Sequence, residues 1–307
     1  MTIKSLTVTA LAPMSDHAAN RGEKLLGNAS SIKRRPDGRV YISGQMQRHA
    51  LFSAIDRLNA DDPDRGETFV ANGDAPALDM AIDLRSDLGG FLEPSLGDYS
   101  GRRTAPLTAT PAVAVHESEV GRDLLVRVKP DPKRVTKTGK VDDKPQALAT
   151  NEYSQRDLMR MSFHVDVGAV SRTKAFTYDD EKHVGTEIET HGIDDAERRR
   201  RVRLALEATR SLTDYANQAR NATSGEPERV LIVLDPKMSR KAARFFEPRT
   251  SDAEREAVQA NLLAELDARG ALVFQGDDTT ADGPSVHEAY EAALAALAEH
   301  DLYDPAA

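Results

Sequence analysis

Polar side chains that could bind a phosphate gather where a predicted strand meets a predicted helix. Residues 39–43 alternate polar and apolar side chains, and the apolar residues that follow recur at helical spacing. Ser43 is well suited to cap this helix, whose free N–H groups and positive dipole end favour a phosphate. Gln45, Arg48 and His49 fall on the first turns, where they could grip a phosphate or a base edge. The same residues also suit an ordinary strand–helix junction with a solvated polar face.

Two adjacent arginines follow a glycine in a Gly- and Pro-rich stretch at residues 93–110. Such a composition predicts a flexible loop. Arg102, Arg103 and Thr104 in this loop suit contacts with a nucleic-acid backbone. Two solvated surface arginines are an equally good interpretation of these residues.

A long loop is also expected at residues 12–38, where small, polar and basic residues are mixed without a clear period. Loops of this length in a compact domain are usually functional or disordered. The candidate ligand-binding residues in it are Asn20, Arg21, Lys24, Lys33 and Arg34.

Residues 129–150 contain three prolines and almost no core-forming side chains, so this segment cannot fold alone. It is predicted to project as a basic hairpin or arm. Residues 159–167 then alternate clearly and place Met161, Phe163 and Val165 on one face of a strand. The arm is therefore expected as an insertion between two strands of a sheet. Its basic side chains are Lys133, Arg134, Lys137 and Lys140.

The elements that must position these groups follow from hydrophobic periodicity. Strands are expected at residues 3–11, 39–43, 110–117, 123–128, 159–167, 230–234 and 271–275. Helices are expected at residues 44–59, 193–220, 236–246, 251–269 and 284–300, the second of these being the longest.

Motifs with a recognised catalytic chemistry are absent from the sequence. It has no Walker A loop, no dinucleotide-binding glycine motif, no zinc-protease motif and no serine-hydrolase elbow. The arginine run at residues 198–201 could bind an anion, although a solvated helix face is the better interpretation. The acidic residues 179–181, beside Lys182 and His183, could hold a cation but more often form a solvated turn. No catalytic residue, metal site or cofactor is expected.

The composition predicts a well-solvated globular protein. The 307 residues are 39% hydrophobic and 30% charged, which is enough for one large domain or two small ones. The absence of cysteine excludes disulfides, thiolate metal sites and cysteine nucleophiles. No apolar run is long enough to span a membrane, so a cytoplasmic protein without a membrane partner is expected. Aromatic residues are only 5%, which argues against recognition by many stacking platforms.

The charge is distributed very unevenly along the chain. The net charge is −9, but residues 251–307 carry 13 acidic residues against two arginines, a net of −11. Residues 21–48 have a net charge of +5, and residues 122–144 have a net charge of +4. Two basic segments on an acidic body indicate local binding of an anionic polymer.

The order of these segments resembles the Cas-seven or DevR-like family, the backbone subunits of type I CRISPR Cascade complexes. The resemblance is carried by I-S-G-Q-M-Q-R at residues 42–48, D-L-G-G-F at 87–91 and G-R-R-T-A-P-L at 101–107. The basic insertion and the strand M-S-F-H-V-D-V at residues 161–167 stand where that family has its thumb and the following strand. The likeness spans roughly the first 235 residues.

The resemblance implies an α+β fold, a modified ferredoxin-like (RRM-like) palm with inserted finger elements and a thumb hairpin. The whole chain, residues 1–307, would form one palm domain with insertions. The finger region would lie at 60–110, the thumb at 129–152, and an acidic helical part at 236–307 would pack on the palm. Copies would polymerise along a guide RNA (crRNA) with other Cascade subunits, and target DNA would be recognised through the guide. The candidate residues above would then bind RNA, and those of the thumb would contact the neighbouring copy.

Two other functions remain open on the sequence. A metal-dependent ribonuclease of the same fold would use a loop aspartate, and Asp16 and Asp37 are the acids available besides Glu23. A module for protein interaction or regulation would bind no RNA. We predict a non-catalytic subunit.

Overall fold

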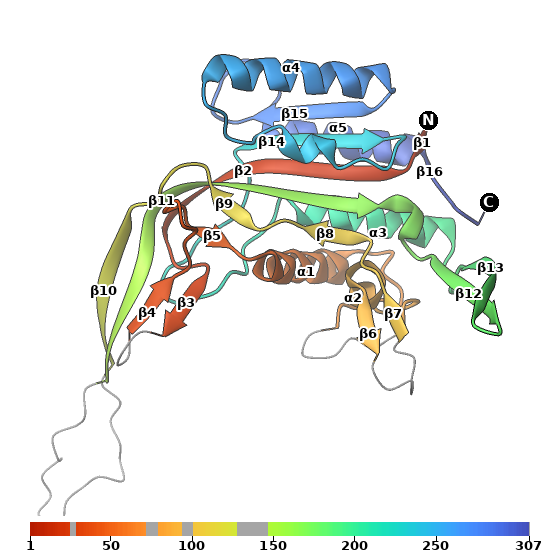
Figure 1. The fold of residues 1–307 in the computed structure, drawn as a ribbon, viewed down its shortest axis with the longest axis horizontal. Coiled ribbons are helices and arrows are strands. Elements are labelled where there is room, and N and C mark those ends of the chain that lie inside the picture. The colour runs from red at the N-terminus through yellow and green to blue at the C-terminus, as the bar shows by residue number, and fades with distance from the viewer. Residues whose placement is uncertain (25–28, 72–78, 94–100, 128–146, 307) are drawn as a thin grey trace, which may run out of the picture.

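The computed structural model describes residues 1–24, 29–71, 79–93, 101–127 and 147–306. The strands of its central sheet and two helices alternate along the chain in the order strand, helix, strand, strand, helix, strand, where the second strand is interrupted and counted as β8 with β9 (Figure 1). These elements are β2 (Ser5–His17), α1 (Gly44–Asp61), β8 (Leu107–Ala109) with β9 (Ala112–Ala114), β11 (Ala147–Asp166), α3 (Asp195–Ala208) and β14 (Arg229–Asp235).

The strand order defines the topology of this core. β2 lies between β14 and β11, and β8 and β9 pair with the other side of β11, all antiparallel. The first strand of the unit thus neighbours the fourth and third, as in the ferredoxin-like arrangement. The α+β, ferredoxin-like fold predicted from the sequence is confirmed.

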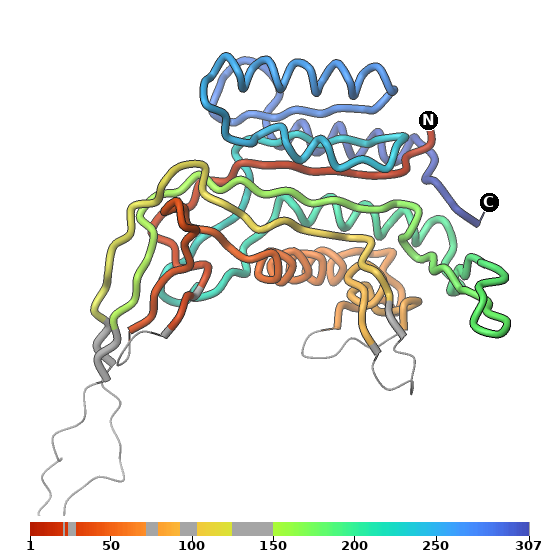
Figure 2. Tube along the Cα trace, in the orientation of Figure 1, coloured from red at the N-terminus to blue at the C-terminus, as the bar shows by residue number. Residues whose placement is uncertain are grey.

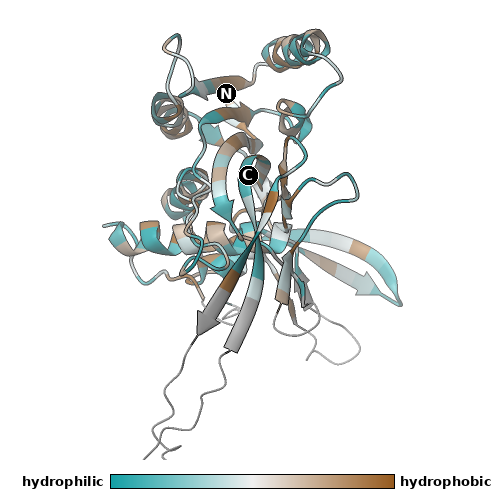
Figure 3. Ribbon diagram, turned by 90° about the vertical axis from the view of Figure 1, so that its left-hand side faces the viewer, coloured by the Kyte–Doolittle hydropathy of each residue, from teal (hydrophilic) through white to brown (hydrophobic). Residues whose placement is uncertain are grey.

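Helix α1 forms as its sequence predicts. The Ser43 hydroxyl accepts a hydrogen bond from the Met46 N–H at 3.3 Å and caps the helix. Ala50, Ala54 and Ile55 are fully buried, so the apolar stripe of the helix packs on the sheet. The helices carry hydrophobic and hydrophilic segments side by side (Figure 3).

Strand β11 has one apolar and one polar face. Met159, Met161, Phe163 and Val165 are at most 1% exposed and face α1 and α3 in the main core. Ser162 and His164 alternate with them and lie on the opposite face of the sheet. The strand predicted at residues 159–167 is therefore confirmed and starts earlier, at Ala147.

Two projections leave the core on the same side of the molecule (Figure 1). The first, called the arm, is the long antiparallel pair of β10 and β11, with β3 and β4 continuing the same sheet beside β11. The second, called the finger, is a short helix with a two-stranded sheet. The arm contains β3 (Arg21–Lys24), β4 (Ala29–Ile32), β5 (Tyr41–Ile42) and β10 (Val120–Arg127); the finger contains α2 (Leu84–Gly89), β6 (Phe91–Glu93) and β7 (Gly101–Arg103).

The C-terminal part extends the central sheet. Strand β15 pairs with β14, whose side chains alternate between two cores. Ile232 faces the main core, where one C-terminal helix packs, and Val233 faces a second core under another helix. The elements are β15 (Leu272–Asp277), α4 (Asp252–Ala268) over the second core and α5 (Val286–Glu299) over the main core.

The remaining hairpin and the short strands at the two chain ends lie at one end of the molecule. The hairpin of β12 (Thr173–Asp179) and β13 (Lys182–Glu189) follows a 3₁₀ turn at Val167–Ala169. The two chain ends lie near each other (Figure 2), where β1 (Thr2–Ile3) pairs with β16 (Asp301–Leu302).

Outside the finger, three local predictions were wrong. Residues 12–38 are not one loop, because β2 continues to His17 by pairing with β11 and is followed by β3 and β4. Helix α3 ends at Ala208 rather than residue 220, and Asn217 beyond it has a φ of 64°, which a helix does not allow. Among the described helices α1 is the longest, with 18 residues. Residues 236–246 contain only a 3₁₀ turn, Lys241–Arg244.

Candidate nucleic-acid interface

Helix α1 runs between the roots of the arm and the finger (Figure 1). Gln45 is exposed on its first turn, and Ser43 is half-buried at its cap. The His49 side chain is 49% exposed, and its Nε2 lies 3.2 Å from Asp214 Oδ2. The Ser53 hydroxyl donates to the same carboxylate at 2.7 Å. These side chains place donors and acceptors on one exposed helix face, as the sequence predicts.

Arg48 and Arg85 form the most distinctive group on this face. Their guanidinium carbons lie 5.8 Å and 4.8 Å from the centroid of the Phe52 ring. Arg48 donates to the Gly89 carbonyl at 2.5 Å, and neither arginine forms a salt bridge with a described residue. Burial lowers the pKa of Arg85, while the charges of Asp83 and Asp56 raise it. Burial, and then the charge of Arg85, lowers the pKa of Arg48. A phosphate placed here would relieve two half-buried like charges.

A second basic group lies at the root of the arm. Lys33 is half-buried, and Arg34 shares the Glu152 carboxylate with Arg122 at 3.4 Å and 3.0 Å. The Arg34 and Arg122 side chains are 41% and 68% exposed. One carboxylate thus faces two exposed cations, and a net positive charge remains at the surface.

Three more cations lie where the arm meets the sheet. Burial lowers the pKa of Arg160, while Glu247 raises it and the charges of Arg35 and Arg39 lower it further. Arg35 stands 6.0 Å from the Tyr41 ring centroid. Arg85 and Arg160 carry no signal in the sequence, because neither belongs to a basic run.

Two predicted RNA-binding residues are instead used inside the protein. Asn20 is 3% exposed and its amide donates to the Tyr41 carbonyl, tying the segment between β2 and β3 to β5. Arg103 is 7% exposed, belongs to β7 rather than to a flexible loop, and forms a buried ion pair with Asp87. It also donates to the Arg172 and Ala169 carbonyls at 3.0 Å and 2.9 Å. Neither side chain is free to meet a phosphate.

The same network corrects the interpretation of residues 198–201. Arg201 is fully buried and donates to Asp87 at 2.8 Å, so one carboxylate joins the finger to α3. Arg198 donates to the Val167 and Val170 carbonyls at 2.6 Å and 3.0 Å. Arg200 is 6% exposed and donates a hydrogen bond to the side-chain oxygen of Asn59 on α1 at 2.8 Å. The arginines predicted to form a solvated helix face are therefore buried, and they link α3 to the finger, to α1 and to the segment after β11.

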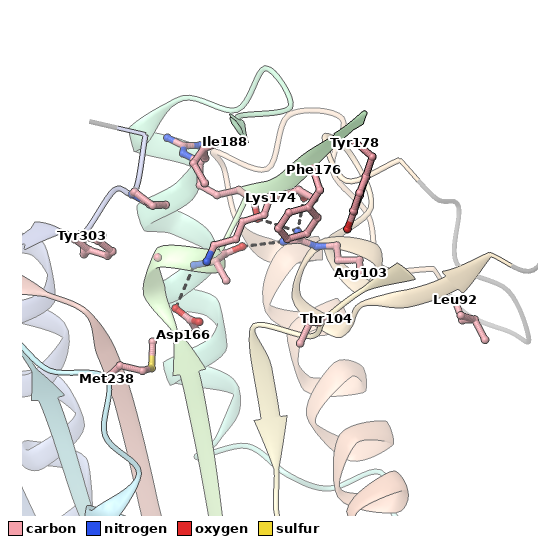
Figure 4. A pocket seen from close by; sticks show the side chains of 15 residues that line it. Leu92, Arg103, Thr104, Asp166, Lys174, Phe176, Tyr178, Ile188, Met238 and Tyr303 are labelled. Atoms are coloured by element: carbon pink, nitrogen blue, oxygen red, sulfur yellow. Dashed lines mark hydrogen bonds between the residues drawn. The ribbon is translucent and has the colours of Figure 1, made fainter. Parts of the chain in front are cut away.

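A pocket of about 890 Å³ lies where the finger, the end of β11 and the β12–β13 hairpin meet (Figure 4). Lys174, Phe176 and Tyr178 alternate along β12 and line it, with Thr104 exposed nearby. Phe176 and Tyr178 are 51% and 61% exposed. The His183 ring meets both edge-on, at 5.8 Å and 5.9 Å. Two exposed rings beside a lysine suit stacking with a nucleobase.

This aromatic stripe could have been found from the sequence, because K-A-F-T-Y at residues 174–178 has the period of a strand. The acidic residues 179–181 are exposed and stand at the turn of the hairpin, as the solvated-turn interpretation predicts.

The acids considered for metal chemistry are dispersed. Asp37 is bound by Arg39 at 2.7 Å, and that contact lowers its pKa. Asp16 is exposed, with a φ of 47°. Across the described ranges, no cluster of three or more His, Asp or Glu side chains could hold a metal ion. No described helix is long and apolar enough to cross a membrane.

Several predicted contacts lie outside the part of the chain that the structure describes. These are the side chains of Arg21, Lys24 and Arg102, together with Lys133, Arg134, Lys137 and Lys140 of the proposed thumb.

The fold and its basic face define a ferredoxin-like protein with an arm and a finger. The chain belongs to the CRISPR-associated DevR/Csa2 family: the model described as "CRISPR-associated negative auto-regulator DevR/Csa2" matches residues 8–252. No curated protein matches the chain.

Two solved structures share the fold. A chain titled "CRISPR RNA-guided surveillance complex" is 17% identical with a TM-score of 0.57, and the alignment covers 98% of this chain and 94% of that one. A chain titled "CRISPR RNA-guided surveillance complex, pre-nicking" is 15% identical with a TM-score of 0.56, covering 95% and 99%.

Proposed function

We propose that this protein is a guide-RNA-binding backbone subunit of a CRISPR RNA-guided surveillance complex. Its family and the fold that it shares with two chains from such complexes support this role. The observation that carries the proposal is the pair Arg48 and Arg85, held against Phe52 with no salt-bridge partner among the described residues. Burial lowers the pKa of both arginines, although the charges of Asp83 and Asp56 raise that of Arg85. Two partly desolvated guanidinium groups held together suit one phosphate of a nucleic-acid backbone.

The proposed binding mode holds the RNA backbone and leaves its bases available. Arg48 and Arg85 take one phosphate, and Arg34 with Lys33 takes others at the root of the arm. Phosphate contacts carry no sequence information, so any guide sequence can be accommodated. The bases then read target DNA by pairing.

In the same proposal, copies of this chain polymerise along the guide and join the other subunits of the complex. The segment at residues 129–152 would contact the next copy. The role is non-catalytic and calls for no metal or cofactor.

Binding of fluorescent single-stranded RNAs tests this function. Two RNAs of unrelated sequence should bind with equal affinity, and the affinity should fall steeply as salt rises, by about 0.7 log units per log unit of salt for each phosphate contact. A strong preference for one sequence, or the absence of binding to both, would contradict the proposal.

A further inference from the structure

The outer edge of β15 carries backbone groups that the described chain does not use. β14 pairs with one side of β15, and no described strand pairs with the other. Natural proteins usually protect such an edge with lysine, proline or a bulge. β15 has none of these devices, since its sequence is L-V-F-Q-G-D and its register with β14 is regular.

The direction of the free groups follows from one hydrogen bond. The Asp277 N–H donates to the Pro284 carbonyl at 3.0 Å, away from β14. Because backbone groups alternate along a strand, Val273 and Gln275 also turn their N–H and C=O groups outward. Neither makes an outward backbone hydrogen bond with another described residue. Two residues therefore offer up to four hydrogen bonds.

These groups open into a groove of about 540 Å³ between the strand edge and α5. Val273, Phe274 and Ala292 give it apolar walls, and Pro284 and Glu288 lie along its other side. Beyond Gln275 the segment before α5 lies close against the strand, since a side chain at Gly276 would come within 2.6 Å of the Ser285 carbonyl oxygen. The groove lies along Val273 to Gln275, beside the strand edge where an added strand would pair.

Charge indicates which partner would fit the groove. Glu288 lines it, and the strand and helix that form it belong to residues 251–307, which carry 13 acidic residues against Arg255 and Arg269. Both arginines are already paired, Arg255 with Asp252 at 2.7 Å and Arg269 with Glu265 at 3.3 Å. An acidic surface of this kind repels nucleic acid and favours a basic partner.

We propose that the β15 edge is a docking site for an extended, basic segment of a partner protein, which adds a strand beside Val273 and Gln275. The site is separate from the proposed RNA interface and does not depend on it. Alternating apolar side chains of the segment would fill the groove, and its basic side chains would face the acidic surroundings.

A short peptide that alternates valine with lysine is the probe, and the same peptide with glutamate in place of lysine is its control. The full-length protein should bind the lysine peptide alone. Gln275→Pro removes an outward N–H without touching the ladder to β14 and should weaken binding by about tenfold. Gln275→Thr keeps that N–H and should bind as the wild type does.

Amide hydrogen exchange of the wild type supplies a measurement that needs no variant. The peptide should slow exchange at Val273 and Gln275 and leave Leu272 and Phe274, already bonded to β14, unchanged. Equal binding to Gln275→Pro, protection elsewhere, or no binding of the lysine peptide would overturn the proposal. Self-association of the wild type that Gln275→Pro abolishes would also overturn it, because the occupant would then be a second copy.

Discussion

Replacing Arg48 and Arg85 by methionine should remove one phosphate site while leaving the fold intact. Methionine keeps the apolar stem that packs near Phe52 and removes only the charge. Arg48 loses one hydrogen bond, to the Gly89 carbonyl, and the half-buried like charges disappear. The free energy of unfolding should therefore stay within about 1 kcal/mol of the wild type.

The effect on RNA affinity follows from the number of phosphate contacts removed. Each phosphate of a single strand that the protein neutralises adds about 0.7 to the slope of log K against log salt. Because the two arginines are proposed to share one phosphate, the salt slope of the double variant should fall by about 0.7. At about 0.1 M salt this corresponds to roughly a fivefold loss of affinity.

Fluorescence anisotropy of a labelled single-stranded RNA, repeated at several salt concentrations, measures both quantities. Arg255→Met is the matched control, because Arg255 is an exposed arginine on α4 paired with Asp252. The control should bind RNA like the wild type. An unchanged slope in the double variant, or an equal loss in the control, would refute the assignment of this pair as a phosphate site.

Three further outcomes follow from the structure. Asp87→Ala leaves Arg103 and Arg201 buried without their shared carboxylate and should cost about 3–5 kcal/mol of stability in urea unfolding; a change below 1 kcal/mol would contradict this link between the finger and α3. Burial lowers the pKa of His164 from 6.5 to about 4. The free energy of unfolding should therefore be highest above pH 6.5 and should fall by about 1.4 kcal/mol per pH unit between pH 6.5 and pH 4. In unfolding curves His164→Gln should flatten this dependence on pH. Phe176→Ala with Tyr178→Ala should weaken RNA binding by about 1–3 kcal/mol per stacked base without changing the salt slope, and an unchanged affinity would exclude the pocket from the interface.

Local signals in the sequence were sufficient for the elements that build the core. The cap at Ser43, the stripe along α1 and the alternation of β11 depend on neighbouring residues, and the structure shows all three. Family resemblance supplied the connectivity, which no local signal contains.

The site was harder to predict because the role of an arginine depends on distant partners. Arg103 and Arg201 bind the same carboxylate from positions about a hundred residues apart, so the sequence offered no sign of their burial. Arg85 stands alone in the sequence but meets Arg48 across Phe52 in the fold. β2 extends through polar residues to His17 because β11 pairs with its backbone and Asp157 on β11 binds the His17 side chain. In each case tertiary contacts decided the outcome.

The most direct test of the proposed role is size-exclusion chromatography of the purified protein, with and without a co-expressed guide RNA, while absorbance is followed at 260 and 280 nm. The proposal predicts a large, RNA-rich species in the presence of the guide, with nucleotides protected from nuclease at regular intervals. A small, RNA-free species under both conditions would contradict it.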